Sequence, residues 1–330
     1  MHVEIVAPAL LAAQGESRHP ALELLLARGR RMHNDPLALE RWLAREFGLG
    51  EEPLPAGALT ALAGGLEPGE DTWLRADPVH LRLQRDSMML VPAAGFDVSQ
   101  AEAEAIADAV NRHFGASFSV HVVSPTAWAL RAKADAAIEG RAPLDLAGQD
   151  VNANLPTGAD AARWHATLNE VQMLLHEHPV NEAREVPLNS LWFWGAGRLP
   201  KEAEGPWQSV TAEDPVALGL AKLAAMRHRA LPSGAREWLE RLPDAGRHLV
   251  VLDALAAAAA LRDGEAHTAR LGAMEADWFT PLLAALKSGR VGMITIHLPE
   301  AGISIETARG DLRRFWRQPR PVTAYAANPA

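Results

Sequence analysis

The sequence predicts an α/β protein in which strands and helices alternate along the chain. Three observations lead to this prediction. Short apolar runs, typical of buried strands, occur near both ends of the chain at residues 3–6, 248–252 and 291–297. Amphipathic helical patterns, divided by turn residues, lie between these runs. The composition, with 48% hydrophobic and 22% charged residues in 330, is that of an ordinary globular chain with a sizeable core.

The first quarter of the chain predicts one strand, three helices and two further strands. Residues 3–6 form the strand, which Pro8 ends. Helices are expected at 19–32 and 35–47, the second beginning at Asp35-Pro36, and a short helix at 58–63. Residues 72–74 and 81–91 have strand character, and Pro78 is expected to break them apart with a polar loop.

The middle of the chain contains the clearest helix, at residues 99–114. Ser99 and Glu102 have the spacing of a capping box, in which each side chain bonds the other residue's backbone amide. A strand pair at 117–123 and 127–132 should follow, then a loop at 142–158, a helix at 160–176 and a strand at 189–194.

The last third predicts helices alternating with strands. Asp214-Pro215 should begin a helix that runs to residue 226, and a strand follows at 248–252. Residues 266–287 are expected to be helical with a kink at Pro281. A strand at 291–297 and an edge strand at 302–306 complete the pattern.

Charge and composition exclude several classes of function. The net charge of −9 argues against nonspecific nucleic-acid binding, and the arginine-rich residues 309–320 are interpreted as a solvated face. The chain has no cysteine, so any metal would need His, Asp or Glu ligands. No signal peptide or membrane span is evident, so we expect a cytoplasmic protein with no nucleic-acid or membrane partner. A homodimer remains open.

Several consecutive motifs carry a family resemblance. They are VSQAEAEAIADAVNRHF at 98–114, the strand pair at 117–132, LDLAG at 144–148 with NLP at 154–156, LNEVQMLLHEHPVNEAR at 168–184, and LNSLWFWGAG at 188–197. In this order they resemble the archaeal-type cofactor-independent phosphoglycerate mutases of the alkaline phosphatase superfamily. The most similar group is a bacterial offshoot labelled phosphoglycerate mutase-like or regulator of pathogenicity factors. The resemblance implies an alkaline-phosphatase-like three-layer core, residues 1–94 and 184–330, with a smaller α+β cap subdomain inserted at 95–183.

The chain departs from this family where the resemblance implies metal ligands. The first strand is followed by Ala7 rather than by Asp. Asp253 survives after a later strand, but alanines stand where the family has a histidine, and His297 follows Ile296 where the family has Asp-His. A two-metal phosphotransfer site needs several such ligands close together. We therefore expect neither a metal nor another cofactor.

Seven polar residues remain as candidates for a site. Asp77, His80, Asp253 and His297 are the candidate catalytic residues, with Asp77 placed to orient His80 as an acid/base pair. Arg75, Asn181 and Arg184 are candidates to bind an anionic small molecule. The structural alternatives are a turn at Asp77-Pro78, a locally bonded His297, and a conformational lock at residues 178–181. Asn181 and Arg184 could equally fix the linker in place.

Two functional hypotheses follow from the resemblance and its departures. The first is a non-catalytic regulatory or scaffold protein that binds an anionic small molecule. The alternative is an active phosphoglycerate mutase or phosphomonoester hydrolase with an altered metal site. A dimeric structural protein is a third interpretation.

Overall fold

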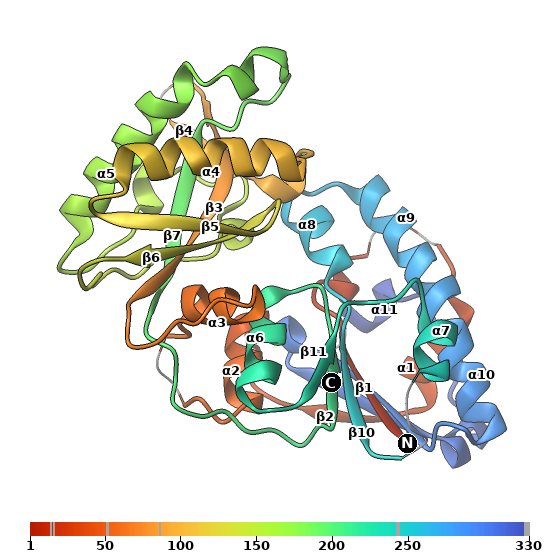
Figure 1. The fold of residues 1–330 in the computed structure, drawn as a ribbon. Helices are drawn as coiled ribbons and strands as arrows, with labels where there is room; N and C mark the ends of the chain where they lie inside the picture. Colours follow the sequence, from red (N-terminus) through yellow and green to blue (C-terminus); the bar gives the residue numbers. More distant parts are fainter. Residues whose placement is uncertain (14, 16, 51–52, 86, 242–244, 327–330) are drawn as a thin grey trace. The chain divides into compact units, whose positions relative to one another are not determined.

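The chain forms two compact units, each described by itself (Figure 1). The computed structural model describes residues 1–13, 15, 17–50, 53–85, 87–241 and 245–326. Unit 1 combines Met1–Gly48 with Glu204–Ala330, and unit 2 is Leu49–Ala203. Unit 2 is therefore an insertion between the two segments of unit 1.

Unit 1 is built on a mixed seven-stranded sheet in the order β2-β12-β11-β1-β10-β8-β9. β1 (His2–Val6) lies at its centre, parallel to β10 (Arg247–Val251) and β11 (Met293–Leu298). β8 (Ser209–Thr211) and β9 (Arg227–Arg229) extend the parallel part, while β12 (Ile303–Ala308) and β2 (Arg30–His33) pair antiparallel. The carboxyl ends of the parallel strands thus lie at one edge, the usual place for a site in α/β folds.

Helices cover both faces of this sheet. Val3, Ile5 and Ile294 point to one face and join a core with α1 (Pro20–Arg28), α7 (Ala235–Glu240), α9 (Gly264–Met274) and α10 (Thr280–Ser288). On the other face α2 (Leu39–Glu46) places Trp42 over the His297 ring, with the ring centroids 5.0 Å apart. Unit 1 is therefore a three-layer α/β domain. The remaining helices of unit 1 are α6 (Pro215–Leu223), α8 (Ala254–Ala260) and α11 (Thr323–Ala326).

Unit 2 is an antiparallel sheet with helices on both faces. The strand order is β4 (Met88–Pro92), β3 (Trp73–Leu83), β6 (Ala127–Ala132) and β5 (Phe118–Ser124). A fifth strand, β7 (Ser190–Gly197), pairs with β3 along the edge opposite to β4 and β6. α3 (Ala56–Ala63) packs on one face through Gly57, where an added Cβ would lie 2.3 Å from the Leu74 backbone. α4 (Gln100–Phe114) and α5 (Ala161–His176) pack on the other, where Trp164 meets Phe193.

The inserted unit begins earlier and ends later than the expected cap. The expected boundaries at 95 and 183 lie inside the unit Leu49–Ala203. The reason is β3, which the expected boundaries place in the core. It pairs with β6 and β7, so α3, β3 and β7 belong to the same sheet domain as the strand pair β5–β6.

Four expected features differ in the structure. Pro78 does not break β3, because it lies between the stretch paired with β6 and the stretch paired with β4, where β3 bonds only β7. The helix expected to reach residue 32 ends at Arg28, and Gly29 allows the chain to turn close against β12 into β2. The next helix begins at Leu39 rather than Asp35, since the chain first bonds Pro299 through the amide of Leu37. β12 is not the expected edge strand, because β2 pairs with it and lies at the edge of the sheet.

Other elements are confirmed. Ser99 and Glu102 form the predicted capping box of α4, and Asp214 caps α6. The helical stretch expected at 266–287 is present, and a π-helical turn at Glu275–Phe279 separates its parts α9 and α10. None of the helices in the described part of the chain has the length and apolar character that crossing a bilayer requires.

Candidate functional site

Arg75 and Asp77 form a buried ion pair on one face of β3. Arg75 Nε lies 2.9 Å and its terminal nitrogen 2.7 Å from Asp77 Oδ1. The Trp194 indole donates to Asp77 Oδ2 at 2.7 Å, the Trp128 amide donates to Oδ1 at 3.3 Å, and Arg75 also donates to Thr60. Burial raises the pKa of Asp77, while Arg75 and the other donors oppose that rise. These contacts occupy the carboxylate, so the cluster is built to stabilise unit 2.

His80 does not meet Asp77, although both lie on β3. Side chains an odd number of positions apart point to opposite faces of a strand. His80 Nδ1 lies 3.0 Å from the Pro187 carbonyl oxygen, and burial lowers the pKa of His80. The acid/base pair expected from the sequence is therefore not formed.

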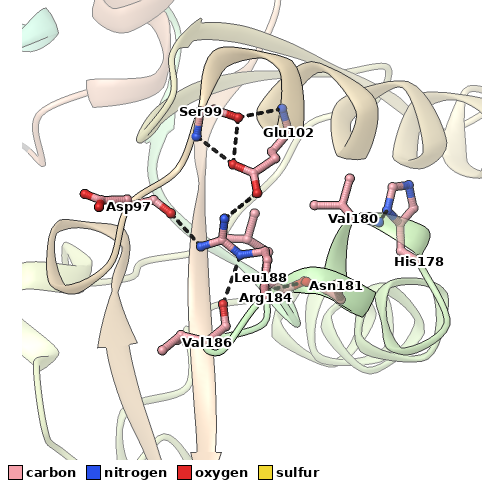
Figure 2. Close-up of polar contacts among 9 residues, drawn as sticks. All are labelled: Asp97, Ser99, Glu102, His178, Val180, Asn181, Arg184, Val186 and Leu188. Carbon is pink, nitrogen blue, oxygen red and sulfur yellow. Dashed lines mark hydrogen bonds and ion pairs between the residues drawn. The ribbon is translucent and has the colours of Figure 1, made fainter.

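Asn181 is bonded on all sides to the backbone of unit 2. Its amide donates to the carbonyls of Leu175 and Leu188 at 2.9 and 3.0 Å, and its oxygen accepts from the Leu188 amide at 2.8 Å. The turn that holds Asn181 is itself capped by His178, whose Nδ1 accepts from the Val180 amide (Figure 2). These contacts tie the end of α5 to the start of β7.

Arg184 connects the same turn to the start of α4 (Figure 2). It donates to the Val186 carbonyl at 3.0 Å, to Glu102 Oε1 at 2.6 Å and to the Asp97 carbonyl at 2.5 Å. The hydrogen bonds from Ser99 and the ion pair with Arg184 lower the pKa of Glu102 to about 2. An anionic ligand at Arg184 would have to compete with a carboxylate that is already in place.

In unit 1, the strand ends that should carry metal ligands bear mostly aliphatic residues. The buried Ala7 follows β1 directly, and the buried Leu252 separates β10 from Asp253. Because β1 lies between β10 and β11, Asp253 and His297 come from strands that are not neighbours. Burial, followed by the nearby Asp214, raises the pKa of Asp253 to about 7.

His297 takes part in a polar network inside the sheet. Its Nε2 lies 3.1 Å from Glu4 Oε2, and its Nδ1 lies 2.9 Å from the Ser304 hydroxyl. The ionised Glu4 can only accept, so Nε2 carries the hydrogen and Nδ1 accepts from Ser304. Burial raises the pKa of Glu4, but hydrogen bonds from His297 and Arg247 outweigh it and lower that pKa to about 2. Both nitrogens of His297 are therefore engaged by the protein.

The residues at these strand ends do not fit the two-metal site that the family implies. No three His, Asp or Glu side chains converge to hold a metal ion within the part of the chain that the structure describes. His297 has no free lone pair, and Asp253 is not joined by a second strand-end ligand from β1.

Comparison with known proteins finds a family match to one segment of the chain. Residues 56–181 match the sequence profile of the 2,3-bisphosphoglycerate-independent phosphoglycerate mutases. In this segment, which is less than half of the chain, the protein is similar to that family. The matched segment runs from α3 through the turn containing Asn181, so it lies entirely in unit 2.

Curated relatives match over a still shorter stretch. A probable 2,3-bisphosphoglycerate-independent phosphoglycerate mutase of Geobacter sulfurreducens is 38% identical over 65 residues, covering 18% of this chain and 16% of the relative. The 2,3-bisphosphoglycerate-independent phosphoglycerate mutase of Methanosarcina mazei is 35% identical over 63 residues, again 18% and 16%. The match thus spans about a sixth of those relatives' length.

Solved structures extend the comparison to the whole chain. The PH0037 protein from Pyrococcus horikoshii has a TM-score of 0.55 and 14% identity, covering 93% of this chain and 87% of that one. The cofactor-independent phosphoglycerate mutase from Thermoplasma acidophilum aligns with a TM-score of 0.42 and 20% identity over 94% and 90%. The fold is alkaline-phosphatase-like, as predicted, with a three-layer α/β unit interrupted by an inserted α+β unit.

Sequence reasoning missed the centre of the unit 1 network. Glu4 was treated as part of an apolar strand, and neither Arg247 nor Ser304 was singled out. A signal was available, because a glutamate within the run Val3–Val6 must be buried if the strand is central. Buried carboxylates require partners.

Proposed function

We propose that this chain is a pseudoenzyme of the phosphoglycerate mutase family, retained as a regulatory or scaffold protein that binds an anionic small molecule. The observation that carries the proposal is the state of the strand ends in unit 1. Ala7 supplies no ligand, and His297 uses both ring nitrogens inside the protein. Phosphate monoesters are very inert without catalysis, so partial machinery gives little turnover.

The intact parts of the fold support retention for a purpose other than catalysis. The capping box of α4 and the contacts of Asn181 and Arg184 hold unit 2 in a defined form. An organised inserted unit, together with strand ends in unit 1 that lack the expected metal ligands, fits a role in binding or assembly.

The test is turnover by the purified full chain. We expect no conversion of 3-phosphoglycerate and no hydrolysis of p-nitrophenyl phosphate with Mn²⁺, Co²⁺ or Zn²⁺ above the rate of the Asp253→Asn variant. Asp108→Asn, an exposed change on α4, is the matched control. Metal-dependent turnover that Asp253→Asn abolishes and Asp108→Asn leaves intact would overturn the proposal. Calorimetric titration with 3-phosphoglycerate tests the binding part separately.

One observation favours the alternative of an active enzyme with an altered site. Asp253 lies near Asp214 and Glu213, so carboxylates gather where β8 and β10 end. Carboxylates at strand ends are typical ligands of hard cations. Under this alternative, turnover follows Asp253, and the same assay distinguishes the two functions.

A further inference from the structure

Two buried histidines line one small cavity in unit 1. His19 directly precedes α1 and is 5% exposed, and His267 lies on α9 and is 2% exposed. Both side chains border a cavity of about 10 Å³, and each leaves its Nδ1 buried without a hydrogen-bond partner. The hydroxyl residues Thr268 and Thr323 also line it. A space of this size holds about one water molecule or one ion.

The hydrogen bond on the far side of His267 fixes its tautomer. Nε2 of His267 lies 2.9 Å from the carbonyl oxygen of Ala9. A carbonyl oxygen only accepts, so Nε2 carries the hydrogen and the neutral ring has a lone pair on Nδ1. Metal-binding histidines typically donate their second ring nitrogen to a backbone carbonyl in this way. His267 is thus oriented as a metal ligand is.

The N-terminus of α1, which His19 directly precedes, is not available to an anion in the cavity. A helix N-terminus attracts anions through its free amides. Here carboxylates already occupy that end of α1, because Glu23 accepts from the His19 amide at 3.0 Å and Glu275 accepts from the Ala21 amide at 2.7 Å. Arg18 pairs with Glu23.

We propose that this cavity binds a single divalent transition-metal ion of the zinc class, with Nδ1 of His19 and Nδ1 of His267 as its protein nitrogen ligands. Hydroxyl oxygens that line the cavity complete the coordination. Imidazole nitrogens suit zinc, nickel and copper, whereas magnesium and calcium require oxygen ligands such as carboxylates. No carboxylate is among the described residues that line the cavity. Neither Asp253 nor His297 borders the cavity, so the site is independent of the proposed function.

The experiment is a calorimetric titration of the metal-stripped full chain with Zn²⁺. We expect one ion per chain at this site and no binding of Mg²⁺. His19→Gln and His267→Gln should each weaken zinc affinity by at least about tenfold, since even loss of an outer-shell partner has that effect. His228→Gln, an exposed histidine on β9, is the matched control and should leave the affinity unchanged. Far-UV circular dichroism checks that each variant is folded.

A second measurement removes any dependence on the variants. Anomalous diffraction at the zinc edge from crystals of the unmodified protein, grown with Zn²⁺, should give a peak bonded to both Nδ1 atoms. A water molecule in the cavity with zinc elsewhere or absent would overturn the proposal. So would an affinity that neither His19→Gln nor His267→Gln reduces.

Discussion

Asp77→Ala tests whether the Arg75–Asp77 pair is a structural centre of unit 2. Asp77 receives the guanidinium of Arg75, the Trp194 indole and the Trp128 amide, and it is 5% exposed. Truncation to alanine removes the acceptor for all three. The arginine is itself 6% exposed, so it cannot turn to solvent without opening the sheet.

The expected loss is a large part of the stability of a domain. Removing one partner of a buried ion pair costs about 3–5 kcal/mol, because the other charge remains buried without a counter-charge. Each orphaned N–H would cost about 1–3 kcal/mol alone, but water entering the vacated space reduces that share. We therefore expect the free energy of unfolding to fall by about 4 kcal/mol. In Asp71→Ala, which breaks the exposed pair with Arg131, the loss should be about 0–1 kcal/mol.

Urea denaturation with hydrogen exchange assigns the loss to the correct unit. Amides of β3, β6 and β7 should exchange faster in Asp77→Ala, whereas amides of β1 and β10 should keep their protection, because the lost contacts all lie in unit 2. Adding Arg75→Leu should recover part of the stability, since it removes the unpaired charge. The reasoning is refuted if Asp77→Ala loses no more than Asp71→Ala, or if the double variant is less stable than Asp77→Ala alone.

Three further changes test other parts of the fold. Gly57→Ala should lower the melting temperature, because its Cβ would meet the Leu74 backbone. Gly272→Ala on α9 places its Cβ in open space and should raise the free energy of unfolding by about 0.5–1 kcal/mol. Equal melting curves for the two variants would contradict this. Asn181→Ala removes three bonds to the backbone and should cost about 2–3 kcal/mol in urea denaturation, and a loss below about 0.5 kcal/mol would count against the lock. The pKa of Glu4 is about 2 in the folded protein against 4.5 when unfolded, so its contribution of about 3 kcal/mol is present above pH 4.5 and lost as the pH falls towards 2. Glu4→Gln should flatten this acid dependence, and parallel acid profiles for the two proteins would disprove it.

Strong local signals made much of the fold predictable. The capping box at Ser99 and the Asp214-Pro215 start both mark helices that begin where expected. The strands β1, β10 and β11 were visible as apolar runs because a central parallel strand is buried on both faces. Elements whose position depends on a distant partner were harder. The polar β2 forms only because β12 offers its edge, and the three-residue strands β8 and β9 are too short for a periodic pattern.

The candidate site was less predictable, because side-chain partners are set by tertiary contacts. Asp77 and His80 are close in sequence, yet a strand sends them to opposite faces. Arg75 does lie with Asp77, since residues two apart share a face. The partners of Glu4 are Arg247 and His297, more than two hundred positions away in the sequence, and no local pattern predicts these contacts. His19 and His267 were likewise separated by most of unit 1.

The bonding of His297 accounts for a histidine at this strand without a metal ion. A metal ligand must offer a lone pair, but Nδ1 of His297 already accepts from Ser304 and Nε2 donates to Glu4. Moving the ring towards a metal would leave Glu4, 3% exposed, with Arg247 as its main partner and would break the contact with the Trp42 ring. Desolvated carboxylates tolerate such a loss poorly. The requirement for a partner to Glu4 is therefore sufficient to keep His297 in place without any catalytic role.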